Sequence, residues 1–221
     1  MKLFLDTANL EEIEKGLKQG ILSGITTNPS LIAKEPKADY LAHIKQITDL
    51  CRKYNQEIPL SIEVFQVEPE KMIEQAKDFV SQLNYSNLVI KIPIGWPELR
   101  VIKELSKNNI KVNCTCGFDE AQAILAANAG ARYFSFFCGR MKDAGINPFE
   151  VIKRARQLFE GTDTEIIIGS IRHMEDVVNS FLAGAHIVTA PLNVLEKMAV
   201  HPKTTESIEG FLNDFRHWIG Q

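Results

Sequence analysis

Short apolar runs alternate with amphipathic segments along the whole chain. Eight runs are apolar or β-branched and short enough for strands. Between them, apolar residues recur at the spacing of a helix face. The predicted strands are 2–6, 22–27, 59–65, 87–92, 110–115, 132–137, 164–170 and 185–189. The predicted helices are 9–19, 39–54, 69–83, 97–107, 119–129, 147–160 and 173–183.

This alternation of strands and helices predicts an α/β fold with a parallel sheet. Eight units within 221 residues favour a closed (β/α)8 barrel of the TIM type, near the lower end of its size range. An open doubly wound sheet is the alternative. Its nucleotide-binding form carries G-x-G-x-x-G after the first strand, and the sequence lacks that motif. We therefore expect residues 1–221 to form a single (β/α)8 barrel domain.

A further helix is predicted at 204–219, beyond the eighth unit. It places Phe211, Phe215 and Trp218 on one apolar face at helical spacing. Such a face needs a partner, which is either the helix's own barrel or a neighbouring subunit.

The fourth predicted strand carries a lysine within an otherwise apolar run, Asn87-Leu-Val-Ile-Lys-Ile-Pro93. Lysine is rarely fully buried without a reason. Burial penalises the ammonium form of a lysine relative to the free amine, and the free amine is the form that Schiff-base formation requires. A side chain that reaches solvent at the end of the strand is the alternative.

Polar residues that could take part in catalysis or ligand binding follow or end nearly every predicted strand. In a (β/α)8 barrel these ends gather at one rim, where the active site forms. A shared rim therefore predicts one polar site rather than scattered surface residues. The residues concerned are Asp6, Thr26, Thr27, Asn28, Glu63, Lys91, Asn113, Thr115, Ser135, Phe137, Arg140, Ser170 and Arg172.

Their side chains suit the parts of a Schiff-base reaction on a sugar. Asp6 and Glu63 can move protons, and the Thr115 hydroxyl can help to hold a relay water. Neutral hydrogen-bonding groups suit a polyol, and the Arg140 and Arg172 guanidinium groups suit a terminal phosphate or similar oxyanion. A purely structural role is an alternative for each residue alone, and the combination favours catalysis.

Strand alternation assigns faces to these residues. Asn113 and Thr115 share one face, and so do Ser135 with Phe137 and Ser170 with Arg172. The cysteines at 114 and 116 then face the helices. We interpret this C-x-C pair as packing rather than zinc binding, because no second cluster of Cys or His lies nearby.

The composition and charge of the chain disfavour several classes of function and location. A net charge of −3 and a pI near 6.0 give no support to nucleic-acid or membrane binding. Four scattered cysteines do not form a disulfide framework. The sequence shows no signal-peptide pattern and no apolar run of membrane-spanning length. We expect a cytoplasmic protein.

The chain resembles the small-subunit transaldolases and the related fructose-6-phosphate aldolases. Thr26-Thr-Asn-Pro-Ser30 and Lys91-Ile-Pro93 are the most specific of the matching stretches, which run from end to end. The matches are Leu5–Asn9, Gly24–Ile32, Val89–Pro93, Ala129–Ala131, Cys138–Arg140 and Ser170–His173.

The resemblance implies residue roles. Lys91 would form the Schiff base to a dihydroxyacetone unit, and Asp6 would be the acid/base at carbon–carbon cleavage. Glu63 and Thr115 would hold the catalytic water. The sugar hydroxyls would contact Asn28, Asn113 and Ser135, with Thr27 and Phe137 in the same binding region, and the distal phosphate would contact Arg140, Ser170 and Arg172.

The resemblance also implies no metal and no organic cofactor. It implies a homo-oligomer, often a decamer of two pentameric rings linked through the C-terminal helix. Family members that act mainly as aldolases tend to carry Gln and Tyr where this chain has Glu63 and Phe137, so both positions favour transfer. An aldolase that releases free dihydroxyacetone and a non-catalytic sugar-phosphate-binding barrel are the alternatives.

Departures from the family pattern cluster near the predicted site. Trp96, Gly169 and Cys116 stand where the family usually has other residues. Drift in packing is one explanation. The other is an altered acceptor or anion pocket, with Trp96 and Gly169 reshaping the space around Ser170 and Arg172. A 6-deoxy-6-sulfo-ketose such as sulfofructose would suit such a pocket, because a sulfonate carries less charge than a phosphate.

Overall fold

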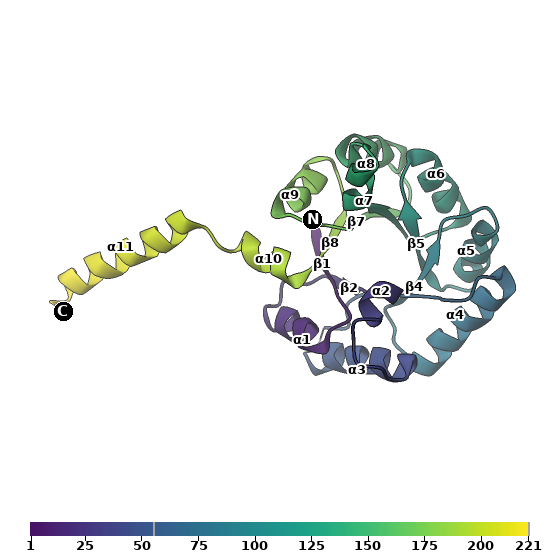
Figure 1. Cartoon of the computed structure of the whole chain (residues 1–221), viewed down its shortest axis with the longest axis horizontal. Coiled ribbons are helices and arrows are strands. Elements are labelled where there is room, and N and C mark those ends of the chain that lie inside the picture. The colour runs from purple at the N-terminus through teal and green to yellow at the C-terminus, as the bar shows by residue number, and fades with distance from the viewer. Residues whose placement is uncertain (55, 221) are drawn as a thin grey trace.

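Eight parallel strands close into a barrel in chain order in the computed structural model, which describes residues 1–54 and 56–220. β8 pairs with β1, and the predicted (β/α)8 fold is confirmed (Figure 1). The strands are β1 Lys2–Asp6, β2 Gly24–Thr26, β3 Leu60–Glu63, β4 Leu88–Pro93, β5 Lys111–Gly117, β6 Tyr133–Phe137, β7 Glu165–Gly169 and β8 Ile187–Ala190.

Helices surround the barrel, and capping side chains fix where several begin. The Asn9 side chain accepts from two backbone N–H groups of α1, and Asp119 accepts from Gln122 N at the start of α6. The helices predicted from periodicity are α1 Leu10–Lys18, α3 Tyr40–Lys53, α4 Pro69–Leu83, α5 Glu98–Lys107, α6 Glu120–Ala129, α8 Pro148–Leu158, α9 Met174–Leu182 and α11 Pro202–Trp218. Short helices that periodicity did not predict are α2 Pro29–Ile32, α7 Cys138–Asp143 and α10 Leu192–Met198. None of the described helices is long and apolar enough to cross a membrane.

Two apolar layers hold the barrel together. The larger packs the outer faces of the strands against the helices and includes Cys114, as predicted. The smaller lies inside the barrel and consists of Phe4, Val89, Tyr133, Ile167 and Ile187. Each of these five precedes a cavity-lining residue by two positions. Because strand side chains alternate, this layer forms a floor under the polar rim.

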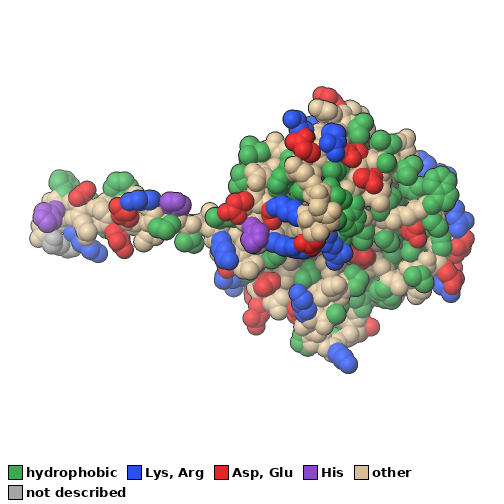
Figure 2. Space-filling view, turned by 45° about the horizontal axis from the view of Figure 1, so that its top comes forward, with side chains coloured by type: hydrophobic (Ala, Val, Ile, Leu, Met, Phe, Trp, Pro, Cys, Tyr) green, Lys and Arg blue, Asp and Glu red, His purple; other side chains and the backbone are tan. Residues whose placement is uncertain are grey.

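The C-terminal helix α11 extends away from the barrel, and all of its residues are exposed (Figure 1). Packing on its own barrel, one of the two expectations, is not the arrangement in this structure. Hydrophobic side chains lie along the projecting helix between charged ones (Figure 2). The large apolar residues exposed on α11 and just after it are Ile208, Phe211, Leu212, Phe215, Trp218 and Ile219.

Two face assignments from strand alternation are wrong. Cys116 does not face the helices, because its φ of 64° is left-handed and the β5–β6 register shifts between Cys114 and Gly117. This kink turns Cys116 towards the cavity. The seventh strand ends at Gly169, and Ser170 is also left-handed with φ 57°. Ser170 and Arg172 therefore do not share a strand face.

Candidate active site

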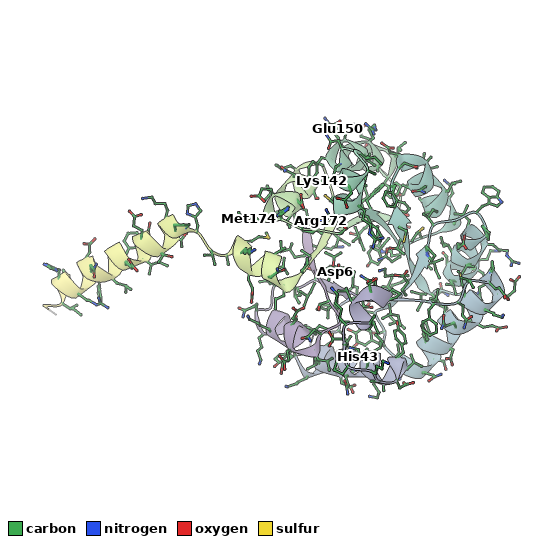
Figure 3. The ribbon with its side chains drawn as sticks, in the orientation of Figure 1. Asp6, His43, Lys142, Glu150, Arg172 and Met174 are labelled. Atoms are coloured by element: carbon green, nitrogen blue, oxygen red, sulfur yellow. The ribbon has the colours of Figure 1, made fainter. Side chains whose placement is uncertain are left out.

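A cavity of about 310 Å³ opens at the C-terminal ends of the strands, and Figure 3 labels one of its lining residues, Asp6, inside the ring of helices. This volume suits a small ligand. Eleven of the thirteen polar or aromatic residues predicted at the rim line this cavity, and the other two, Thr27 and Arg172, do not. Its lining residues are Asp6, Thr26, Asn28, Pro29, Ser30, Glu63, Lys91, Asn113, Thr115, Cys116, Ser135, Phe137, Arg140, Gly169, Ser170 and Thr189.

Lys91 lies at the centre of the charged groups and is only 5% exposed. Its Nζ lies 3.1 Å from Glu63 Oε2 and donates to the Thr27 carbonyl oxygen at 2.8 Å. Glu63 and Lys91 are register partners on β3 and β4, so sheet pairing places the carboxylate beside the amine. Thr27 is fully buried, and its hydroxyl donates to Ser61 O at 3.1 Å. Thr27 thus orients Lys91 through its backbone and does not line the cavity.

Asp6 ends β1 and receives a hydrogen bond from the Thr26 hydroxyl at 2.7 Å. Thr26 in turn lies 2.6 Å from the Thr189 hydroxyl, which forms a chain from β8 through β2 to β1. Burial raises the pKa of the Asp6 carboxyl, whereas the charge of Lys91 and the hydrogen bond from Thr26 oppose this rise without cancelling it. A raised pKa means that the ionised carboxyl binds a proton more tightly than an ordinary aspartate does, which suits a group that accepts a proton and later returns it.

Neutral hydrogen-bonding side chains lie on β5 and β6. Ser135 Oγ donates to Asn113 Oδ1 at 2.7 Å, and both side chains are buried. The Thr115 hydroxyl is buried in the cavity wall and has no hydrogen-bond partner within the described part of the chain. A buried hydroxyl normally has a partner, so this position is suited to a water or a substrate oxygen. Asn28 lines the opposite side, where its side chain accepts from Leu31 N at the start of α2.

The far end of the cavity carries the candidate anion-binding groups. Arg140 lines it, and its guanidinium carbon lies 4.8 Å from the centre of the Phe137 ring, within range of a cation–π contact. Ser170 lines it as well. Arg172 is exposed at the rim and makes a two-point ion pair with Asp143, at 2.7 and 2.5 Å. Arg172 is not part of the cavity lining.

Of the three residues that depart from the family pattern, Gly169 and Cys116 line the cavity and Trp96 does not. Trp96 is 80% exposed and lies outside the lining of the cavity, so it does not reshape the space around Ser170. Gly169 lines the cavity, and a Cβ there would meet its nearest neighbour, a Thr189 methyl, at an ordinary 3.5 Å. Cys116 also lines the cavity, where burial and then the charge of Glu63 raise the pKa of its thiol. A raised thiol pKa favours the protonated form.

Several residues of this region were not predicted from the sequence. Ser30 and Thr189 line the cavity, and Asp143 holds Arg172. Asp176 is almost fully buried beneath the anion end and accepts hydrogen bonds from the backbone N–H groups of Arg172 and His173. The sequence signal for Asp176 was its place three residues after a helix N-cap, which is typical of a carboxylate that reaches back to the cap. Among the described residues, no group of three or more His, Cys, Asp or Glu is arranged to hold a metal.

A family model described as Transaldolase/Fructose-6-phosphate aldolase matches residues 3–219. The chain belongs to this family. It is 44% identical over 217 residues to a probable transaldolase of Alkaliphilus metalliredigens, covering 97% of this chain and 98% of that one. It is 45% identical over 218 residues to a probable transaldolase of Caldicellulosiruptor saccharolyticus, covering 97% of each. Family membership identifies a transaldolase-type enzyme, which transfers aldehyde or ketone residues.

A solved structure also shares the architecture. Thiamine phosphate pyrophosphorylase from Pyrococcus furiosus superposes with a TM-score of 0.61 over 86% of this chain and 85% of that one. The two sequences are 14% identical, so this similarity concerns the barrel fold alone.

Proposed function

We propose that the protein removes a three-carbon dihydroxyacetone unit from a ketose with an anionic group at C6. Lys91 retains this unit as a Schiff base and passes it to an aldose such as glyceraldehyde 3-phosphate or erythrose 4-phosphate. The observation that carries this proposal is the buried Lys91 amine, 3.1 Å from Glu63 within a polar cavity. Binding alone requires no such nucleophile, which disfavours a non-catalytic sugar-binding barrel.

Schiff-base formation requires the amine of Lys91 to lose a proton and attack the C2 carbonyl of the ketose. Glu63 is close enough to accept that proton. The resulting carbinolamine then loses water. Glu63 and the unpartnered Thr115 hydroxyl border the same cavity, which supports their role in holding this water and returning it at hydrolysis.

Cleavage of the C3–C4 bond requires a base for the proton of the C4 hydroxyl. Asp6 fits this role, because its raised pKa lets the ionised form accept a proton and the protonated form return it to the acceptor. The electrons of the broken bond move into the Schiff base and give an enamine. The aldehyde product leaves, and the incoming aldose aldehyde takes its place.

The remaining lining residues suit the rest of a sugar chain. Asn28, Asn113 and Ser135 offer amide and hydroxyl groups for the substrate hydroxyls. Arg140 and Ser170 lie at the far end, where they suit the terminal anion. The aldolase alternative would release the three-carbon unit as free dihydroxyacetone. Glu63 and Phe137 support transfer over this alternative, on the basis of the family resemblance.

Charge at the anion end favours a sulfonate as well as a phosphate. Lys91 is paired with Glu63 and Asp143 neutralises Arg172, so Arg140 is the lining cation left for a substrate anion among the described residues. A phosphate monoester carries about 1.5 to 2 negative charges at neutral pH, whereas a sulfonate carries one. We propose that a 6-deoxy-6-sulfo-ketose is accepted at least as well as the corresponding 6-phosphate.

We further propose that residues 1–221 act as one barrel domain, with 204–219 used in contacts between subunits of a homo-oligomer. The exposed apolar face of α11 supports this, because Phe211 is 72% exposed and Trp218 is 81% exposed. The decamer remains an expectation from the family resemblance. All four cysteines are free thiols, which supports a reducing compartment such as the cytoplasm.

The donor is tested by comparing fructose 6-phosphate with its 6-deoxy-6-sulfo analogue, using glyceraldehyde 3-phosphate labelled with ¹³C as the acceptor. We expect transfer from both donors, with kcat/KM for the sulfo donor equal to or above that for the phosphate. A preference for the phosphate of more than about tenfold contradicts the sulfonate proposal.

Lys91→Met should lower turnover with both donors by more than about 10³-fold and leave the circular dichroism spectrum unchanged.

The pH dependence of kcat/KM tests the role of Asp6. The carboxylate must be ionised to accept a proton, so the rate should fall as the pH decreases through its raised pKa. Thr26→Val removes a hydrogen bond that favours the carboxylate, and the acid limb should move to higher pH. Thr189→Val is the matched control, because it leaves the bond from Thr26 to Asp6 in place. An acid limb that stays in place or moves to lower pH in Thr26→Val contradicts this role.

Light scattering tests the oligomer. The wild-type protein should have several times the mass of the 24.9 kDa chain, and Phe211→Glu combined with Trp218→Glu should dissociate it. The control is Thr205→Glu combined with Asn213→Glu, which adds the same charge to polar positions of the same helix. A wild-type mass of one chain, or equal dissociation of both variants, would rule out the apolar face as the interface.

A further inference from the structure

The candidate anion-binding groups lie on two separate segments of chain. Arg140 belongs to α7, whereas Ser170 and Arg172 belong to the segment between β7 and α9. Figure 3 labels Lys142 and Arg172, one from each segment, at the same edge of the barrel opening. An anion bound by both segments requires them to keep a fixed separation.

The two segments meet at Gly139. Its backbone N–H donates to the Ser170 carbonyl oxygen at 3.0 Å. A Cβ at this position would lie 2.6 Å from that oxygen and 2.7 Å from Arg172 Nε, so only glycine permits the close approach. A single backbone hydrogen bond at this junction leaves the orientation of the segment 170–173 to other contacts.

Asp176 supplies those contacts. Its side chain is buried, and one carboxylate oxygen, Oδ2, accepts from the N–H groups of Arg172 and His173 at 3.2 Å each. The other oxygen, Oδ1, pairs with Lys142 Nζ on α7. Asp176 therefore joins the segment 170–173 to the helix that carries Arg140.

The charge of Asp176 is maintained despite burial. Burial alone would raise the pKa of its carboxyl, but the hydrogen bonds from Lys142 and from the two backbone N–H groups outweigh burial and hold the pKa below its ordinary range. A buried carboxylate is stable only while such partners remain in place. Loss of Lys142 would leave the charge underpaired and would loosen the link.

Ser170 shows why the link matters to the site. Its left-handed φ of 57° is unfavourable for a residue other than glycine and persists where surrounding contacts impose it. Gly139 contacts the carbonyl group of Ser170 itself, and Asp176 contacts the backbone N–H groups two and three residues further along the chain. Without Asp176, we expect Ser170 to relax and its hydroxyl to leave the cavity wall.

We propose that Asp176, supported by Lys142, is a positioning residue that aligns the two halves of the anion-binding end of the cavity. Asp176 is not among the residues that line the cavity. It acts through the backbone of the segment 170–173, whereas Asp143 acts on the Arg172 side chain. The identity of the substrate in this proposal rests on the proposed function. The presence of an anion site does not.

Two small-molecule probes distinguish a misaligned anion site from a general loss of structure in the variants. The binding of inorganic phosphate reports the anion site alone and is measured by ³¹P NMR line broadening. Dihydroxyacetone has no anion, and its borohydride-trapped adduct reports the lysine end alone. In Asp176→Asn and Lys142→Met, phosphate should bind at least about tenfold more weakly, while adduct yield stays within about twofold of wild type.

Two further variants complete the comparison. Lys142→Arg keeps the cation and should retain wild-type phosphate affinity. Arg154→Met removes an exposed ion pair between α8 and α6, away from the cavity, and should leave both probes unchanged. Equal losses with both probes, unchanged phosphate binding in Asp176→Asn, or a wild-type protein that does not bind phosphate would each overturn the proposal. A wild-type protein that binds phosphate but forms no adduct would instead contradict the proposed function.

Discussion

The ion pair between Lys91 and Glu63 is the interaction on which the site depends. Both groups lie inside the barrel, where a charge is stable only if it is paired and hydrogen-bonded. The Thr27 carbonyl accepts the remaining hydrogen bond that the structure gives Lys91 Nζ, at 2.8 Å. Asp6 adds a second carboxyl, held by Thr26. The arrangement keeps an amine and two proton acceptors together in a space that only a small substrate can enter.

The barrel register makes this arrangement predictable from the sequence. Glu63, Lys91 and Asn113 are successive register partners on β3, β4 and β5. Closure in chain order brings strands together at one rim although their residues are far apart in sequence. Apolar runs that alternate with amphipathic segments therefore sufficed to predict the eight strands and the barrel, and the polar residues at the strand ends predicted most of the cavity lining. Asn113 with Thr115, and Ser135 with Phe137, share faces as expected.

Local backbone exceptions were not predictable in this way. Cys116 and Ser170 both adopt left-handed conformations, which no residue pattern around them signals. The first turns Cys116 towards the cavity, and the second breaks the face that Ser170 was expected to share with Arg172. The pairing of Arg172 with Asp143 depends on the short helix α7, which has too few turns to show periodicity. Trp96 departs from the family pattern but lies on the surface, so sequence difference alone did not locate it at the site.

The most direct test of the account is to trap the Schiff base. The protein is incubated with fructose 6-phosphate or its sulfo analogue, reduced with borohydride, digested and mapped by mass spectrometry. We expect a three-carbon adduct on Lys91 with at least one of these donors and no adduct in Lys91→Met. An adduct on a different lysine, or no adduct with either ketose, would contradict the central claim that the buried Lys91 amine carries the transferred unit.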